Sequence, residues 1–150
     1  MMAIVSILIC LGSCSPEQTS YCEFRSLPND GWFTTMPVRF QPELTDSTAQ
    51  AYNLEIALRH NNTYPYRNFS LVVDLIGNGS VKRREVKTEL ADGYGNWKGT
   101  GFGALYQIKV PVGTIQACDS IKHIVLWQSM RDCDCITGIE NVGVIITPVK

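Results

Sequence analysis

Hydrophobic and polar residues alternate most regularly in the segment that begins at Tyr52. Every second residue of this segment is apolar, namely Tyr52, Leu54, Ile56 and Leu58. Successive side chains of a strand point to opposite faces, so this period of two indicates a strand with one buried face. The segment from 52 to 59 is therefore expected to be a half-buried strand of a sheet.

Several other segments have the composition of strands. Residues 69–76 form a nearly continuous apolar run, which predicts a central strand, and residues 77–80 (Gly-Asn-Gly-Ser) predict a tight hairpin turn. The returning segment, 81–90, carries many charges and is expected to be more exposed. Further strands are predicted over 33–40, 105–110, 121–130 and 141–149, with a turn over 111–113. Pro37 indicates an edge strand or a bulge, because proline has no N–H to donate.

About eight short strands separated by turn signals predict an all-β protein. We expect an antiparallel β-sandwich of jelly-roll or Ig-like type, with a lipocalin-like barrel as the alternative. The uneven strand lengths and the prolines at strand edges favour the sandwich. The length suits one domain, which we place over residues 21–150.

The first fifteen residues have a different character. Residues 3–11 form an uncharged apolar run, shorter than the roughly 20 residues that cross a bilayer but suited to a signal peptide. It ends in Leu11-Gly12-Ser13-Cys14, the order of a lipobox. We expect residues 1–13 to be a lipoprotein signal peptide, Cys14 to carry lipid and residues 14–20 to be a tether. The alternative is an ordinary secretory signal with an incidental cysteine; residues 1–10 hold no Lys or Arg, so the true start stays open.

Charge and hydropathy limit the classes of partner. The net charge is −1, and the only basic cluster is the three residues 82–84, so the footprint of a nucleic-acid-binding protein is absent. No second apolar stretch has membrane-spanning length, so the membrane is expected to be reached through lipid on Cys14. Ser15 after Cys14 is compatible with the outer membrane.

Four cysteines remain once Cys10 and Cys14 are set aside: Cys22, Cys118, Cys133 and Cys135. Exported proteins tolerate disulfides, and four cysteines allow three complete pairings that sequence does not distinguish. A strand over 121–130 would hold Cys118 and Cys133 too far apart to pair. A zinc site is not expected, because the Cys-Asp-Cys segment has no second cysteine pair and no nearby histidine.

Candidate catalytic groups are few. His60 and His123 are the only histidines, and no nucleophile motif accompanies either of them. We expect His60 to hydrogen-bond within a turn and His123 to lie on a sheet surface. Asp92 is expected to form an Asx turn rather than a calcium site. The sequence therefore predicts no catalysis.

Two loops carry the remaining candidates for recognition. The glycine-rich loop 91–103 lacks the ending of a phosphate-binding loop, and its Trp97 is expected to be a core residue more than a ligand platform. The loop 61–68 contains Tyr64, Tyr66 and Arg67, which suit either a recognition patch or ordinary packing within the turn.

Three blocks of sequence occur in a distinctive order behind the lipobox. They are Tyr52-Asn53-Leu54 through Leu58-Arg59-His60-Asn61-Asn62 to Tyr64-Pro65-Tyr66 and Asn68; Leu90-Ala91-Asp92 with Gly95-Asn96-Trp97-Lys98-Gly99-Thr100-Gly101; and Gln128-Ser129-Met130-Arg131 with Gly138-Ile139 and Val142-Gly143-Val144. From about Leu27 to Ile146 the chain resembles the GldH family, lipoproteins linked to gliding motility in bacteria with a Gram-negative envelope. The resemblance implies an envelope lipoprotein beside gliding or protein-secretion machinery, and supplies no catalytic residues. Ala117-Cys118 and Cys133-Asp134-Cys135 depart from the family pattern and suggest an additional local disulfide.

We therefore predict a non-catalytic lipoprotein of the outer membrane that binds other envelope proteins, without cofactor, metal or nucleic acid. The residues expected in its partner-binding surface are Arg59, Asn61, Tyr64, Tyr66 and Trp97. The alternative is a glycan-binding lipoprotein, which would need exposed and coplanar tryptophans at Trp32, Trp97 and Trp127.

Overall fold

The computed structural model describes residues 19–44, 46 and 48–150. Cys14, the expected signal peptide over 1–13 and most of the expected tether lie outside the described residues. Within those residues, no helix has the length and apolar character needed to cross a membrane.

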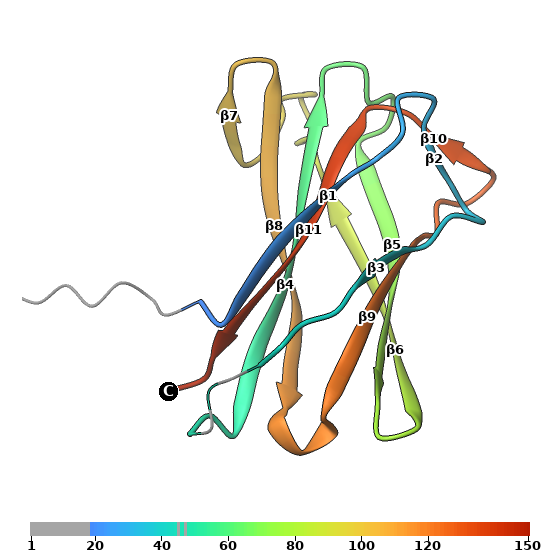
Figure 1. Ribbon diagram of the computed structural model, residues 1–150. Helices are drawn as coiled ribbons and strands as arrows, with labels where there is room; N and C mark the ends of the chain where they lie inside the picture. The colour runs from blue at the N-terminus through green and yellow to red at the C-terminus, as the bar shows by residue number, and fades with distance from the viewer. Residues whose placement is uncertain (1–18, 45, 47) are drawn as a thin grey trace, which may run out of the picture.

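The chain forms two antiparallel sheets that face each other (Figure 1). The five-stranded sheet contains, in spatial order, β1 (Tyr21–Ser26), β11 (Ile139–Pro148), β4 (Ala51–Asn61), β8 (Leu105–Gln116) and β7 (Thr100–Phe102). The four-stranded sheet contains β3 (Val38–Phe40), β9 (Ile121–Gln128), β5 (Asn68–Gly77) and β6 (Ser80–Glu89). A small ribbon pairs β2 (Trp32–Phe33) with β10 (Cys135–Ile136), and a 3₁₀ turn, η1 (Ala117–Asp119), joins β8 to β9. The prediction of an all-β antiparallel sandwich is confirmed.

The core lies between the two sheets and follows the predicted alternation. One face of β4 and one face of β5 are buried along their whole length, through Tyr52, Leu54, Ile56, Leu58, Phe69, Leu71, Val73 and Leu75. Each such side chain stabilises the fold by about 2 kcal/mol relative to an exposed position. β5 lies between β6 and β9, so its prediction as a central strand is also confirmed.

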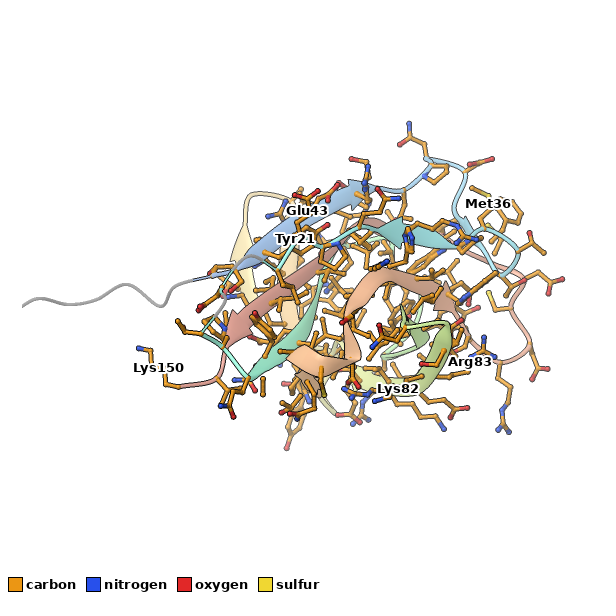
Figure 2. All side chains as sticks on the ribbon, turned by 60° about the horizontal axis from the view of Figure 1, so that its bottom comes forward. Tyr21, Met36, Glu43, Lys82, Arg83 and Lys150 are labelled. Carbon is orange, nitrogen blue, oxygen red and sulfur yellow. The ribbon has the colours of Figure 1, made fainter. Side chains whose placement is uncertain are left out.

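The hairpin between β5 and β6 is the predicted tight turn. Asn78 and Gly79 both have positive φ, 49° and 72°, as the two central residues of a type I′ turn require. β6 ends the four-stranded sheet as a charged edge, and its Lys82 and Arg83 project outward (Figure 2). β3 is the opposite edge of this sheet, as Pro37 predicted.

The predicted turn over 111–113 is wrong. β8 continues through this segment, and the register with β4 shifts between Leu54↔Gly113 and Glu55↔Pro111. The extra residue, Val112, forms a β-bulge, which accommodates Pro111 and Gly113 without ending the strand. The pairing of β8 with β4 therefore extends from Asn61↔Leu105 to Ala51↔Gln116.

The two described ends of the chain lie together. Ser20 N–H donates to the carbonyl oxygen of Ile146 at 2.9 Å, and Val149 N–H donates to that of Ala51 at 2.9 Å. We call this end of the sandwich the terminal end; it lies at the lower left in Figure 1. The loops 62–67 and 90–99 and the β7–β8 hairpin lie at the opposite end, which we call the loop end (Figure 1).

Candidate functional site

An aromatic cluster at the loop end contains most of the predicted surface residues. Its centre is His60, which continues the inward alternation of β4 by one more position and is completely buried. The His60 ring lies 4.6 Å from Trp97, 5.6 Å from Tyr106 and 6.0 Å from Tyr64, measured between centroids. We call His60, Tyr64, Trp97 and Tyr106 the loop-end cluster.

Trp97 reaches the cluster because the glycine-rich loop folds back on itself. The carboxylate of Asp92 accepts hydrogen bonds from the backbone N–H of Tyr94 at 2.8 Å and of Asn96 at 3.0 Å. The prediction of an Asx turn at Asp92 is confirmed. An isolated bridge between Ala91 and Trp97 closes the loop, and the indole N–H of Trp97 donates to Asn62 Oδ1 at 3.0 Å.

Trp97 is half-buried and packs against the core. Its indole therefore joins the two loops of the loop end rather than presenting a free flat face.

The loop 62–67 is shaped by Asn61. Its Oδ1 accepts from the backbone N–H and the hydroxyl of Thr63, at 2.8 and 2.6 Å, and its Nδ2 donates to Glu140 at 2.8 Å. Tyr64 is buried, and its hydroxyl donates to the carbonyl oxygen of Asn68 at 2.6 Å. Asn61 and Tyr64 thus hold the loop in place from within.

Exposed tyrosines surround this buried support. Tyr66 is 41% exposed and lies edge-on to Tyr64, with ring centroids 5.9 Å apart. Tyr94, at the tip of the glycine-rich loop, is 94% exposed. Tyr94 was not among the predicted surface residues; its position next to Gly93 and Gly95 in a loop is the only sequence signal that could have pointed to it.

Arg59 does not join the cluster. It precedes His60 in β4 and therefore points to the opposite face of the sheet. Its guanidinium lies over the ring of Phe24, 3.7 Å from the centroid, and its Nε donates to Gln107 Oε1 at 2.8 Å. The structure thus brings together Asn61, Tyr64, Tyr66 and Trp97, and places Arg59 on the outer face of the five-stranded sheet.

The expectation that His60 lies in a turn is corrected: His60 is a strand residue inside the core. Its Nδ1 lies 3.3 Å from the Asn61 carbonyl oxygen, and its Nε2 has no hydrogen-bond partner among the described residues. Burial lowers the pKa of the imidazole, because the charged form would lose its hydration. His60 is therefore held neutral. Burial likewise raises the pKa of the Tyr64 hydroxyl.

The two histidines lie in different sheets. His60 belongs to the five-stranded sheet at the loop end, whereas His123 pairs with Ile76 of the four-stranded sheet, near its terminal end. The two histidines therefore share no site. Among the described residues, no three His, Cys, Asp or Glu side chains lie close enough together to hold a metal ion.

The expected local disulfide is not formed. The four described cysteines are all free thiols, with Cys22 and Cys118 exposed. Cys133 Sγ donates to the carbonyl oxygen of Cys135 at 3.0 Å, and Cys135 Sγ donates to that of Asp30 at 3.3 Å. The two sulfur atoms of the Cys-Asp-Cys segment therefore have separate partners.

The tryptophans form no common platform for a sugar ring. Trp32 is completely buried between the sheets, and Trp97 belongs to the loop-end cluster. Trp127 lies on the outer face of the four-stranded sheet, where its indole N–H donates to Asp74 Oδ2 at 3.1 Å. The arrangement that the glycan-binding alternative needs is therefore not present.

Comparison with known proteins agrees with the resemblance seen in the three sequence blocks. The chain is 28% identical over 138 residues to "Gliding motility lipoprotein GldH homolog" of Christiangramia forsetii, covering 90% of this chain and 83% of that protein. It is 28% identical over 133 residues to "Gliding motility lipoprotein GldH" of Flavobacterium johnsoniae, covering 88% and 82%. Among solved structures, the infectious bursal disease virus VP2 subviral particle matches 87% of this chain at 13% identity and a TM-score of 0.32, too low to indicate a shared fold.

The family model described as GldH lipoprotein matches residues 19–146, which includes the whole loop-end cluster and both sheets except for the last two residues of β11. This family is not a known enzyme family. From this match, and from the two relatives that align over most of its length, it follows that the chain belongs to the GldH lipoprotein family.

Proposed function

We propose that this protein is a non-catalytic, lipid-anchored component of the gliding motility machinery that works by binding other envelope proteins through its loop end. The anchor is the thioether-linked lipid on Cys14, after removal of residues 1–13, and residues 14–20 are the tether of a single domain, 21–150. The leaflet that holds the lipid is proposed to belong to the outer membrane. The gliding role is supported by the two relatives, which are both named as gliding motility lipoproteins.

The observation that carries the proposal is the position of Tyr66 and Tyr94. Both are exposed at the loop end, 41% and 94%, whereas the chain enters the sandwich at the terminal end. A lipid at Cys14 would attach the terminal end to the membrane and leave the loop end facing away from it (Figure 1). Exposed tyrosines on a rigid aromatic base are typical of residues that dominate binding energy in protein interfaces.

The loop end also carries balanced charge around the tyrosines. Glu89 accepts from Arg67 and from Lys98, each at 3.0 Å. The hydrogen bond from Lys98, together with the charge of Arg67, lowers the pKa of the Glu89 carboxyl. These exposed ion pairs add little stability, but they orient long side chains beside Tyr66 and the glycine-rich loop.

The proposal is tested by site-specific photocrosslinking in intact cells. A photoreactive phenylalanine analogue placed at Tyr94 is expected to link the full-length protein to an envelope protein. Val81, 59% exposed on β6, is the control position, because it lies at the other end of the molecule. Equal yields at the two positions, or products only with lipid, would contradict protein binding through the loop end.

The anchor is tested separately by fractionation. Cys14→Ala is expected to release the protein from the membrane pellet, while Cys22→Ala, which alters an exposed thiol of the folded domain, leaves it there. Retention of the Cys14→Ala variant in the membrane would refute acylation as the means of attachment.

A further inference from the structure

The sandwich is closed along one side and open along the other. On the closed side, Arg84 of β6 donates to the carbonyl oxygen of Thr114 in β8 at 2.7 Å, which joins the two sheets. On the open side, the edge strands β1 and β3 belong to different sheets and do not pair with each other. We call the space between β1 and β3 the open seam.

A groove of about 570 Å³ occupies the open seam. Its lining comes from the end of β1 and the turn after it, and from the segment that leads into β3, and includes Arg25, Leu27, Trp32, Met36, Val38 and Arg39. Met36 is 41% exposed although it is large and apolar, and Figure 2 shows it at the outer surface just before β3. The groove thus combines apolar and cationic side chains and opens to solvent.

The free edge of β1 offers backbone hydrogen bonds next to this groove. β11 is the only strand paired with β1 among the described strands, so the other edge of β1 presents unpaired N–H and C=O groups. β3 is a poorer template, because it has three residues and follows Pro37, which has no N–H. β6 carries four cationic side chains (Lys82, Arg83, Arg84 and Lys87), a common way to block strand addition, whereas β1 carries only Arg25.

The charge of the groove selects the kind of strand that fits. Arg25 and Arg39 stand on its two sides, and none of its described lining residues is acidic. Arg25 lies over the ring of Phe40 at 5.8 Å from the centroid and pairs with Glu23 at 2.6 Å. That ion pair is half-exposed and therefore weak, so a carboxylate from a partner can share the guanidinium.

From these observations we propose that the open seam binds an extended acidic segment of a partner protein, which adds to the free edge of β1 as a further strand. An apolar side chain of this segment would enter the groove beside Met36 and Val38, and its carboxylates would meet Arg25 and Arg39. The inference rests on the proposed function only in that the occupant is a protein; it uses a surface separate from Tyr66 and Tyr94.

The test uses the full-length protein and a short synthetic peptide in which valine and glutamate alternate. Binding is measured by fluorescence anisotropy, and the β1 amides are followed by hydrogen exchange. The peptide is expected to slow exchange in β1 and not in β6. The double variant Arg25→Glu/Arg39→Glu should weaken binding about tenfold or more. The matched control, Lys109→Glu/Lys122→Glu, makes the same change in net charge at exposed positions outside the groove and should bind as the native protein does.

A second peptide separates strand addition from simple charge attraction. It is made in two forms with the same side chains, and each form carries N-methyl groups on the amides along one edge of the extended peptide. The methyl groups remove the hydrogen-bond donors of that edge. One of the two methylated forms should lose binding. The proposal is overturned if the unmethylated peptide does not bind, if both methylated forms bind equally well, or if the two double variants behave alike.

Crosslinking distinguishes this inference from the function of the loop end. A photoreactive residue at Met36 should give a product that the Arg25→Glu/Arg39→Glu change abolishes, and whose linked segment is acidic and extended. A product at Met36 formed with residues 15–20 of this chain or with a second copy would refute a separate partner. If only Tyr94 gives products, the open seam is not a docking site and the proposed function of the loop end stands. If only Met36 gives products, the open seam is a docking site and the loop end is not.

Discussion

Trp97 and His60 make an edge-to-face contact, with ring centroids 4.6 Å apart and an angle of 62° between the planes. The two residues are brought together from β4 and from a glycine-rich loop that follows two further strands. Edge-to-face pairs are a preferred arrangement of aromatic rings and contribute about 1 kcal/mol beyond the area they bury. Burial of His60 in this contact favours its neutral form, because the charged imidazolium would lose its hydration.

The stability of the protein should therefore fall as the medium becomes mildly acidic. The pKa of His60 is lowered in the folded state, so below about pH 6.5 the unfolded chain takes up a proton that the folded chain does not. Stability contributed by neutral His60 is present above that pH and is lost progressively below it. Urea unfolding at pH 7.5 and pH 5.5 measures the loss. His60→Leu should show a smaller loss than the native protein, and His123→Gln should keep the native one; equal losses in all three would contradict this account.

The indole of Trp97 should contribute both packing and a hydrogen bond. Trp97→Phe keeps a ring but removes the donor to Asn62, and is expected to cost about 1 kcal/mol in the free energy of unfolding. Trp97→Ala also removes the ring and should cost about 2 to 3 kcal/mol, since the residue is only half-buried. A cycle of Trp97→Phe with Asn62→Ala isolates the bond. Additive effects of the two changes would show that the bond contributes nothing.

Asp74 should stabilise the outer face of the four-stranded sheet. Both its carboxylate oxygens accept from Arg83, at 2.7 and 2.8 Å, and Oδ2 also accepts from Trp127 at 3.1 Å. The hydrogen bond from Arg83 lowers the pKa of the Asp74 carboxyl, so its stabilisation is present at neutral pH and is lost as pH falls below about 4.

Asp74→Asn is expected to cost about 1 to 2 kcal/mol at pH 7, measured by urea unfolding. Glu89→Gln, which weakens an exposed pair with Arg67, is the control and should change stability less than Asp74→Asn does. A larger effect at Glu89 than at Asp74 would show that burial of the carboxylate is not what decides the strength of the pair.

Gly138 should be required for the buried position of Tyr64. It has φ of 91°, and a Cβ there would lie 2.5 Å from the backbone nitrogen of Tyr64. Gly138→Ala is therefore expected to destabilise the protein by about 2 kcal/mol or more and to displace the loop 62–67, seen as faster hydrogen exchange at Tyr64. Gly93→Ala is the control, because its Cβ would meet nothing within 4 Å. The account fails if the two substitutions cost the same.

The strands could be predicted because their signal is local. The apolar period of β4 and the Gly-Asn-Gly-Ser turn are both readable within ten residues, and both are present in the structure. The same period, extended by two positions from Leu58, would have placed His60 inside the core and Arg59 outside it. A histidine beside an asparagine-rich segment is typical of a turn, but the position of His60 in the alternation is the better guide.

The loop-end cluster could not be predicted in the same way, because its members are distant in the sequence. Tyr64 is buried because Gly138 packs against its backbone, and Trp97 is fixed by Asn62. Neither contact has a local signal. The bulge at Val112 was missed for a related reason: a proline and a glycine near each other are typical of a turn, and only pairing with β4 shows that the strand continues.

Because both described chain ends lie at the terminal end, the position of a fused reporter decides which end of the sandwich it covers. A fluorescent protein fused after Lys150 would lie beside Ser20 and close to the proposed lipid, and it would leave the loop end with Tyr66 and Tyr94 uncovered. A bulky epitope inserted between β7 and β8 would instead cover the loop end. Imaging and pull-down studies should therefore tag the carboxyl terminus through a long spacer, and should treat an insertion in the β7–β8 hairpin as a deliberate blocking reagent.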